Sequence, residues 1–164
     1  MDCGLNGRSY IVTGASSGLG FASAQALAAD GADLVIASRD QERIDDAAAR
    51  LDSPAGVRAV VADLADESAA QRLVATAQEA YGRLDGAVIS VGGPPAGRLE
   101  GTSEQQWRDA FESVFLGGLR MARAVLDTPF DPVDAADATQ PREVAVSLSG
   151  RQMLLHVHPG VDDT

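Results

Sequence analysis

Gly14, Gly18 and Gly20 provide the clearest chemical signal in this sequence. They lie in the segment TGASSGLG, directly after an apolar run and directly before an Ala-rich amphipathic stretch. Glycine permits a sharp turn, lets backbone approach a ligand, and lets a helix pack closely on a sheet. A helix N-terminus at this turn would offer unpaired N–H groups to a diphosphate. A glycine-rich turn can also be purely structural, but the strand–turn–helix context favours dinucleotide binding.

Ser38, Arg39 and Asp40 follow the second apolar run and bear on which dinucleotide would bind. In NAD-binding folds, an acid about 20 residues beyond the glycines accepts the ribose 2′-hydroxyl. Ser38 occupies that position here, and the guanidinium of Arg39 can pair with a 2′-phosphate. The sequence therefore favours NADP(H) over NAD(H). Two alternatives stay open: Asp40 could serve NAD, or Arg39 could be a surface residue paired with Asp40 or Glu42.

The hydropathy pattern predicts a scaffold that would bring these turns together. Apolar runs alternate with Ala-rich amphipathic stretches, which indicates strand–helix–strand units and a parallel sheet covered on both faces. We therefore predict an α/β fold, a Rossmann-like doubly wound parallel sheet of about five strands. Strands are expected at 9–13, 33–37, 57–61, 86–89 and 144–148. Helices are expected at 18–29, 41–51 and 67–81, and a capping box of Thr102 with Gln105 would open another that ends near 126.

The pattern weakens after residue 126. The segment DTPFDPVDAADATQ has the composition of a solvated loop, and from Arg151 the tail shows no clean helical or strand period. We therefore divide the chain into a nucleotide-binding region at 1–126, an acidic, Pro-containing loop at 127–141, and a fifth strand with an irregular tail at 142–164. A sheet that ends at its fifth strand would expose an unpaired edge.

Composition excludes several other functions. The chain has 164 residues, 45% of them hydrophobic, and a formal net charge of −11. This balance suits one globular domain and argues against binding nucleic acid or anionic membrane surfaces. No apolar run approaches the roughly 20 residues of a membrane span. A single cysteine, Cys3, makes the cytoplasm the default location. His156 and His158 lie in the irregular tail, so no metal site is expected.

The glycine turn, Asp63 with Leu64, and Leu84 with Asp85 together resemble the short-chain dehydrogenase/reductase family. The stretch VISVGGPP is similar to a 3-oxoacyl-carrier-protein-reductase-like subgroup with a Gly-Gly-Pro-Pro turn. The resemblance covers about residues 5–126 well and 142–150 loosely. It implies an NAD(P)H-dependent oxidoreductase that transfers hydride between a carbonyl and an alcohol.

The resemblance also implies the residues that contact the cofactor. Asp63 and Leu64 would hold the adenine, although Asp63 could instead be an ordinary acid at a strand end or a helix cap. Arg39 would meet the 2′-phosphate, and the turn from Ser90 to Gly92 would pass beside a ribose. The diphosphate would be lined by Gly14, Ser16, Ser17, Gly18, Leu19 and Gly20.

A helical stretch from Phe111 to Leu126 is similar to the family's interface helix, which implies a possible homo-oligomer. Trp107, Phe111 and Phe115 recur every fourth residue along the same predicted helix. This spacing predicts either core packing or a face for a partner helix.

The catalytic part of the family pattern is missing. In the family a tyrosine protonates the carbonyl, and a lysine four residues later lowers the pKa of that tyrosine. This chain contains no lysine, and Tyr10 and Tyr81 both precede the fifth strand. Val114 stands where the family has an asparagine, and Ser149 is either the catalytic serine or a hydroxyl that satisfies backbone at a strand end. We therefore expect a C-terminally truncated, catalytically incomplete member; the alternative is a non-catalytic dinucleotide-binding or self-associating fragment.

Overall fold

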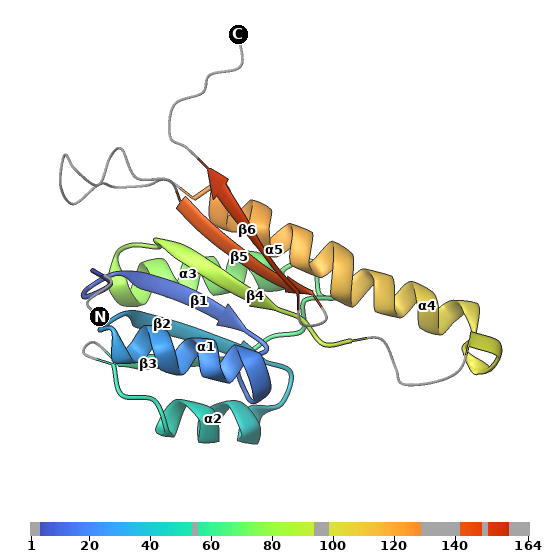
Figure 1. Ribbon diagram of the computed structural model, residues 1–164, viewed down its shortest axis with the longest axis horizontal. Coiled ribbons are helices and arrows are strands. Elements are labelled where there is room, and N and C mark those ends of the chain that lie inside the picture. The colour runs from blue at the N-terminus through green and yellow to red at the C-terminus, as the bar shows by residue number, and fades with distance from the viewer. Residues whose placement is uncertain (1–3, 54–55, 94–98, 129–141, 149–150, 158–164) are drawn as a thin grey trace, which may run out of the picture.

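A computed structural model describes residues 4–53, 56–93, 99–128, 142–148 and 151–157 (Figure 1). Its centre is a six-stranded sheet with the order β3-β2-β1-β4-β5-β6. Strands β1 to β5 pair in parallel and confirm the predicted Rossmann-like fold; their bounds are Ser9–Thr13, Asp33–Ser38, Val57–Val61, Gly86–Ser90 and Arg142–Leu148. The chain winds outward in one direction from β1 and in the other from β4. A crevice is therefore expected where these two central strands end.

The sixth strand departs from the expected fold. β6 (Arg151–Val157) pairs antiparallel with β5, from Leu148 opposite Arg151 to Arg142 opposite Val157. The prediction of an irregular tail was therefore wrong for these residues, as was the prediction that the outer edge of the fifth strand is unpaired. The segment RQMLLHV lacks regular alternation, so its strand conformation follows from pairing with β5 rather than from its own pattern.

Helices cover both faces of the sheet (Figure 1). α1 (Gly18–Ala29) and α2 (Gln41–Ala49) pack on one face, and α3 (Ala69–Tyr81) and α5 (Gly117–Leu126) pack on the other. Successive strand residues pack into the hydrophobic cores on opposite faces of the sheet. Ile11 packs on the face of α3 and α5, and Val12 packs on the face of α1 and α2. This double burial explains the apolar runs of the central strands β1 and β2.

A continuous helical stretch leads into α5. It follows a short 3-10 turn, η1 (Leu99–Gly101), and comprises α4 (Glu104–Ala110) and a π-helical segment, η2 (Phe111–Leu116). Ser103 and Gln106 form the capping box, one position later than predicted, through reciprocal side-chain and backbone hydrogen bonds of 3.3 and 2.8 Å. Among the described residues, no helix is long and apolar enough to cross a membrane.

Strands β1 and β4 are tied together at both ends. At their amino ends, the buried carboxylate of Asp85 accepts a hydrogen bond from the Ser9 backbone N–H at 2.8 Å and pairs with the guanidinium of Arg83. At their carboxyl ends, the Thr13 hydroxyl donates to the Ser90 carbonyl oxygen at 2.9 Å. These contacts fix the spacing of the two central strands next to the expected crevice.

Candidate functional site

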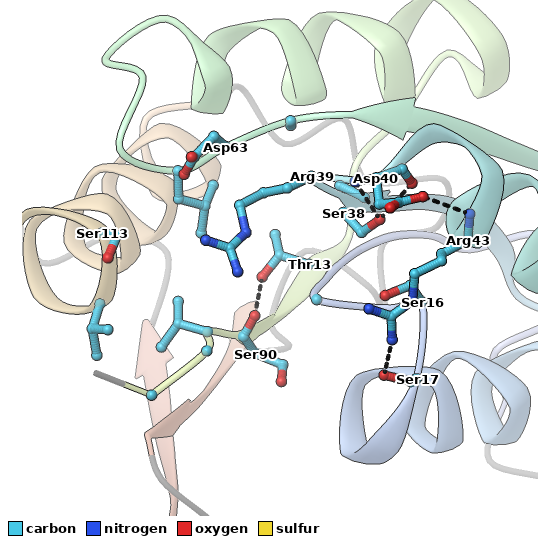
Figure 2. Close-up of a pocket in the computed structure, with 18 residues that line it drawn as sticks. Thr13, Ser16, Ser17, Ser38, Arg39, Asp40, Arg43, Asp63, Ser90 and Ser113 are labelled. Carbon is cyan, nitrogen blue, oxygen red and sulfur yellow. Dashed lines mark hydrogen bonds between the residues drawn. The ribbon is translucent and has the colours of Figure 1, made fainter. Parts of the chain in front are cut away.

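A cavity of about 610 Å³ opens where β1, β2, β3 and β4 end (Figure 2). Its volume lies in the range of small-molecule and cofactor sites. Strand ends and the turns after the four strands supply most of its lining, α2 adds Arg43, and η2 adds Ser113 and Val114. The cavity therefore occupies the crevice in which open α/β sheets bind ligands.

The structure brings most of the predicted site residues to this cavity. Those that line it are Gly14, Ser16, Ser17, Arg39, Asp63, Leu64, Ser90 and Gly92. Gly18, Leu19 and Gly20 do not line it; they form the first turn of α1 beside it. Ser149 lies outside the described residues, so its predicted catalytic role has no structural description.

The glycine turn has a backbone that requires glycine. Gly14 and Gly18 have φ values of +61° and +60°, in the left-handed region that disfavours side chains. A Cβ at Gly14 would lie 2.6 Å from the Ser90 carbonyl oxygen, and one at Gly20 would lie 2.4 Å from the Gly14 carbonyl oxygen. A Cβ at Gly18 would meet no atom within 4 Å. Gly18 therefore leaves open space at the start of α1, which suits close approach by a diphosphate.

Arg39 and Arg43 bring positive charge to the cavity. In Figure 2 the Arg39 side chain extends into the cavity between Asp63 and Ser90. Arg43, from the first turn of α2, donates a hydrogen bond from Nη2 to the Ser17 hydroxyl at 3.2 Å. Within the described part of the chain, no ion pair joins Arg39 to a carboxylate. An unpaired guanidinium that faces a cavity is suited to an anionic ligand.

The aspartates of the cavity have backbone partners. Asp40 caps α2, because its Oδ1 accepts a hydrogen bond from the Arg43 N–H at 3.0 Å. Asp63 Oδ1 accepts from the Ala65 N–H at 3.0 Å, which closes a turn after β3. Asp63 does not cap α3, whose N-cap is Ser68. Its second carboxylate oxygen is therefore available to accept a hydrogen bond from a ligand.

The helical side of the cavity is formed by η2. Ser113 and Val114 line it, and the Ser113 hydroxyl donates to the Asp109 carbonyl oxygen at 3.0 Å. Gly117, directly after η2, packs so closely that a Cβ there would lie 2.4 Å from the Leu64 carbonyl oxygen. This contact positions the Leu64 turn on the wall of the cavity. π-Helical segments are frequent at functional sites.

Sequence reasoning missed Arg43 and Ser113 as lining residues. The one sequence signal for Arg43 is its place three residues after Asp40, because an N-cap places that residue on the first helical turn. Ser113 had no comparable signal, since the widened helix that carries it cannot be read from its side-chain types.

Both tyrosines lie away from the cavity lining. The Tyr81 hydroxyl lies 2.9 Å from the Leu34 carbonyl oxygen and 2.8 Å from that of Gly56, near the amino ends of β2 and β3. Burial raises the pKa of Tyr81. Tyr10 lies within β1 and packs against the α1 and α2 core. Among the described residues, no group of His, Cys, Asp and Glu could hold a metal ion.

The aromatic residues spaced four apart do not pack in the core. Trp107, Phe111 and Phe115 are 46%, 55% and 49% exposed, and Leu119 continues the series at 57%. The rings of Phe111 and Phe115 stack with centroids 5.0 Å apart. Core packing, one of the two predicted roles, is therefore wrong; the four side chains form an exposed apolar stripe along α4, η2 and α5.

Comparison with known proteins identifies relatives of the chain. A family model described as short chain dehydrogenase matches residues 8–132. The human dehydrogenase/reductase SDR family member 2, mitochondrial, is 43% identical over 105 residues, which are 63% of this chain and 38% of that protein. An uncharacterized oxidoreductase of Mycobacterium tuberculosis (strain CDC 1551 / Oshkosh) is 40% identical over 109 residues, 65% of this chain and 41% of that protein.

Solved structures show the same likeness. The L-sorbose reductase of Gluconobacter frateurii, complexed with NADPH and L-sorbose, has a TM-score of 0.69 and 27% identity over 77% of this chain and 49% of its own. A short-chain dehydrogenase/reductase of Brucella melitensis has a TM-score of 0.72 and 31% identity over 77% of this chain and 53% of its own. The chain thus spans about half the length of these structures and less of the two relatives above. By its fold and by the match over residues 8–132, the chain belongs to the short-chain dehydrogenase/reductase family.

Proposed function

We propose that this chain forms the dinucleotide-binding part of a short-chain oxidoreductase and prefers NADP(H) to NAD(H). The observation that carries the proposal is the Arg39 guanidinium, which extends into the cavity without a carboxylate partner among the described residues. The preceding residue, Ser38, supplies no acid for a ribose 2′-hydroxyl. The L-sorbose reductase to which the chain is similar was solved with NADPH.

The residues of the cavity suit the parts of such a ligand in order. At the first turn of α1, Gly18 leaves space for a diphosphate. After β2, Arg39 pairs with the 2′-phosphate. Leu64 supplies an apolar wall for the adenine, and the free carboxylate oxygen of Asp63 accepts a hydrogen bond from its amino group. The turn that begins at Ser90 lies beside the nicotinamide-side ribose. When bound, the dinucleotide would supply the hydride of a carbonyl reduction.

We further propose that the 164-residue chain binds the dinucleotide without turning it over. The sequence has no lysine to lower the pKa of a catalytic tyrosine. The hydroxyl of Tyr81 is engaged by carbonyl oxygens near the opposite edge of the sheet. No phenol of the chain therefore lines the cavity to protonate a substrate carbonyl.

Calorimetric titration of the folded chain with NADPH and with NADH tests the binding proposal. We expect NADPH to bind at least about tenfold more tightly, because a charge-assisted hydrogen bond to the 2′-phosphate contributes about 1.5–3 kcal/mol. Arg39→Gln should remove this difference. Equal affinity of the unmodified chain for both would refute the NADP(H) preference, and no binding of either would refute the site.

The absence of turnover is tested separately by nicotinamide absorbance, with NADPH and either a simple ketone or a 3-oxoacyl thioester. We expect no oxidation of NADPH above the rate without protein. Turnover at an ordinary enzymatic rate would show that another group donates the proton.

The exposed apolar stripe favours a second function, association with a second copy of the chain. Large apolar side chains that line one helical face mark a contact surface. Light scattering of Phe111→Ser/Phe115→Ser is expected to show a smaller particle than the unmodified chain. Val61→Ser is the matched control, because Val61 is 40% exposed but lies on β3, outside the stripe. A monomeric unmodified chain would refute this function.

A further inference from the structure

The arginine side chains fall into groups according to whether they contact a carboxylate, an aromatic ring or neither. Among those whose side chains the structure describes, most pair with a carboxylate: Arg8, Arg72, Arg83, Arg108, Arg120 and Arg123. Arg50 lies over the ring of Phe21, and Arg58 lies over the ring of Tyr81. Arg39 and Arg43 have neither kind of partner, and both line the same cavity. In a chain with a net charge of −11, two unpaired cations at one cavity point to an anionic ligand.

Arg43 is held at the rim of this cavity from two directions. Its backbone N–H donates to the Asp40 carboxylate at 3.0 Å, which fixes the first turn of α2. Its Nη2 donates to the Ser17 hydroxyl at 3.2 Å, although Ser17 lies 26 residues earlier in the chain. A guanidinium carries five N–H donors, so one bond to Ser17 leaves donors for a ligand. In Figure 2 both side chains come from the segment where β2 leads into α2; Arg39 extends toward Asp63 and Ser90, and Arg43 extends toward Ser17.

The charges at this rim show why a second cation matters. Asp40 also lines the cavity, and its carboxylate sits in the same turn as Arg39. Arg39 with Asp40 alone would be neutral overall. Arg43 gives the part of the lining at the β2–α2 turn two cations against one carboxylate, because the other lining carboxylate, Asp63, belongs to the turn after β3. A local excess of positive charge favours binding of a phosphate over a hydroxyl.

We propose that Arg43, held by Ser17, is a second determinant of NADP(H) specificity and contacts the adenosine 2′-phosphate together with Arg39. This inference rests on the proposed function, since it assigns a residue of the same site. Ser17 is then a positioning residue, because its hydroxyl orients the guanidinium. A purely structural role would be different: Arg43 would only fasten α2 to the glycine turn, and its loss would weaken the fold and the binding of both nucleotides alike.

The test is calorimetric titration of Arg43→Gln with NADPH, NADH, adenosine 2′,5′-bisphosphate and AMP. We expect NADPH and the bisphosphate to bind about 10- to 100-fold more weakly than to the unmodified chain. NADH and AMP should change by less than about threefold, the size of a screened surface charge effect. Arg50→Gln is the matched control, because it removes the same charge next to the end of the same helix, outside this cavity, and should leave the NADPH to NADH ratio unchanged.

Each outcome decides between the claims. If Arg43→Gln weakens the binding of NADPH and NADH equally, or weakens neither, the proposed role of Arg43 is overturned. If Arg39→Gln removes the NADPH preference and Arg43→Gln does not, this inference fails and the proposed function stands. If the folded, unmodified chain shows no preference for NADPH, both fail. Ser17→Ala should give a smaller loss in the same direction, and an unchanged affinity there would overturn the positioning role of Ser17.

Discussion

Substitution of Gly14 by alanine tests how the glycine turn is built. Two costs apply, and the structure separates them. The φ of +61° places an alanine in the left-handed region, at a cost of about 1–2 kcal/mol. The new Cβ would also lie 2.6 Å from the Ser90 carbonyl oxygen, which the Thr13 hydroxyl holds in place. Crowding of well-packed atoms costs about 1–3 kcal/mol more. We therefore expect Gly14→Ala to lower the free energy of unfolding by about 2–5 kcal/mol.

Two other glycines supply matched controls. Gly7 and Gly18 have φ values of +72° and +60°, and a Cβ at either would meet no atom within 4 Å. Gly7→Ala and Gly18→Ala should therefore lower the free energy of unfolding by only about 1–2 kcal/mol. Gly18→Ala should also weaken NADPH binding beyond its effect on stability, because its methyl group would occupy the space left for the diphosphate.

Equilibrium unfolding in urea, followed by far-ultraviolet circular dichroism, gives the free energies of the unmodified chain and the three variants. Titration with NADPH then gives the affinity of those that remain folded. If Gly14→Ala were no less stable than Gly7→Ala, the close approach to Ser90 would carry no energetic cost, and the argument for the turn would be refuted.

The remaining predictions concern the surroundings of the site. Gly117→Ala should lower stability in urea by about 1–3 kcal/mol and weaken NADPH binding, because its Cβ would lie 2.4 Å from the Leu64 carbonyl oxygen; unchanged stability would contradict this. Tyr81→Phe should lower the free energy of unfolding by about 1 kcal/mol and leave NADPH affinity unchanged, because it removes a partly buried hydroxyl that lies away from the cavity. Burial raises the pKa of Tyr81 above 10.0, so the stability that the neutral hydroxyl contributes should be full below pH 10.0 and lost as pH rises through the folded-state pKa. A stability difference between the unmodified chain and Tyr81→Phe that does not change with pH would refute this prediction. Hydrogen bonds from Ser68 lower the pKa of Asp66 below 3.8, so Asp66→Asn should be less stable than the unmodified chain above pH 3.8, and the difference should vanish as pH falls through the lowered value; a difference that persists in acid would contradict this assignment.

The turn and the sheet could be predicted from sequence because local constraints specify them. At Gly14 and Gly18 the left-handed backbone disfavours other residues, and the central strands β1 and β2 are buried on both faces. Arg43 could not be assigned in this way, since its partner Ser17 is 26 residues distant and becomes a neighbour only through the packing of α2.

Other features depend on context that the sequence does not carry locally. A spacing of four residues gives one helical face, but it does not tell whether that face meets the sheet or solvent. Trp107 and Phe111 therefore fitted both alternatives until the structure showed them exposed. β6 likewise owes its conformation to a neighbouring strand rather than to its own residues.

The hydrogen bonds that join β1 to β4 at both ends affect the thermodynamics of ligand binding. The Asp85 carboxylate bonds to Ser9 at the amino ends, and the Thr13 hydroxyl bonds to Ser90 at the carboxyl ends. The strands beside the cavity are therefore preorganised before a ligand binds. Binding then immobilises chiefly long side chains at the rim, such as Arg39, at about 0.5–1.5 kcal/mol for each. Amide hydrogen exchange in β1 and β4 should consequently be slow in the free chain and change little on saturation.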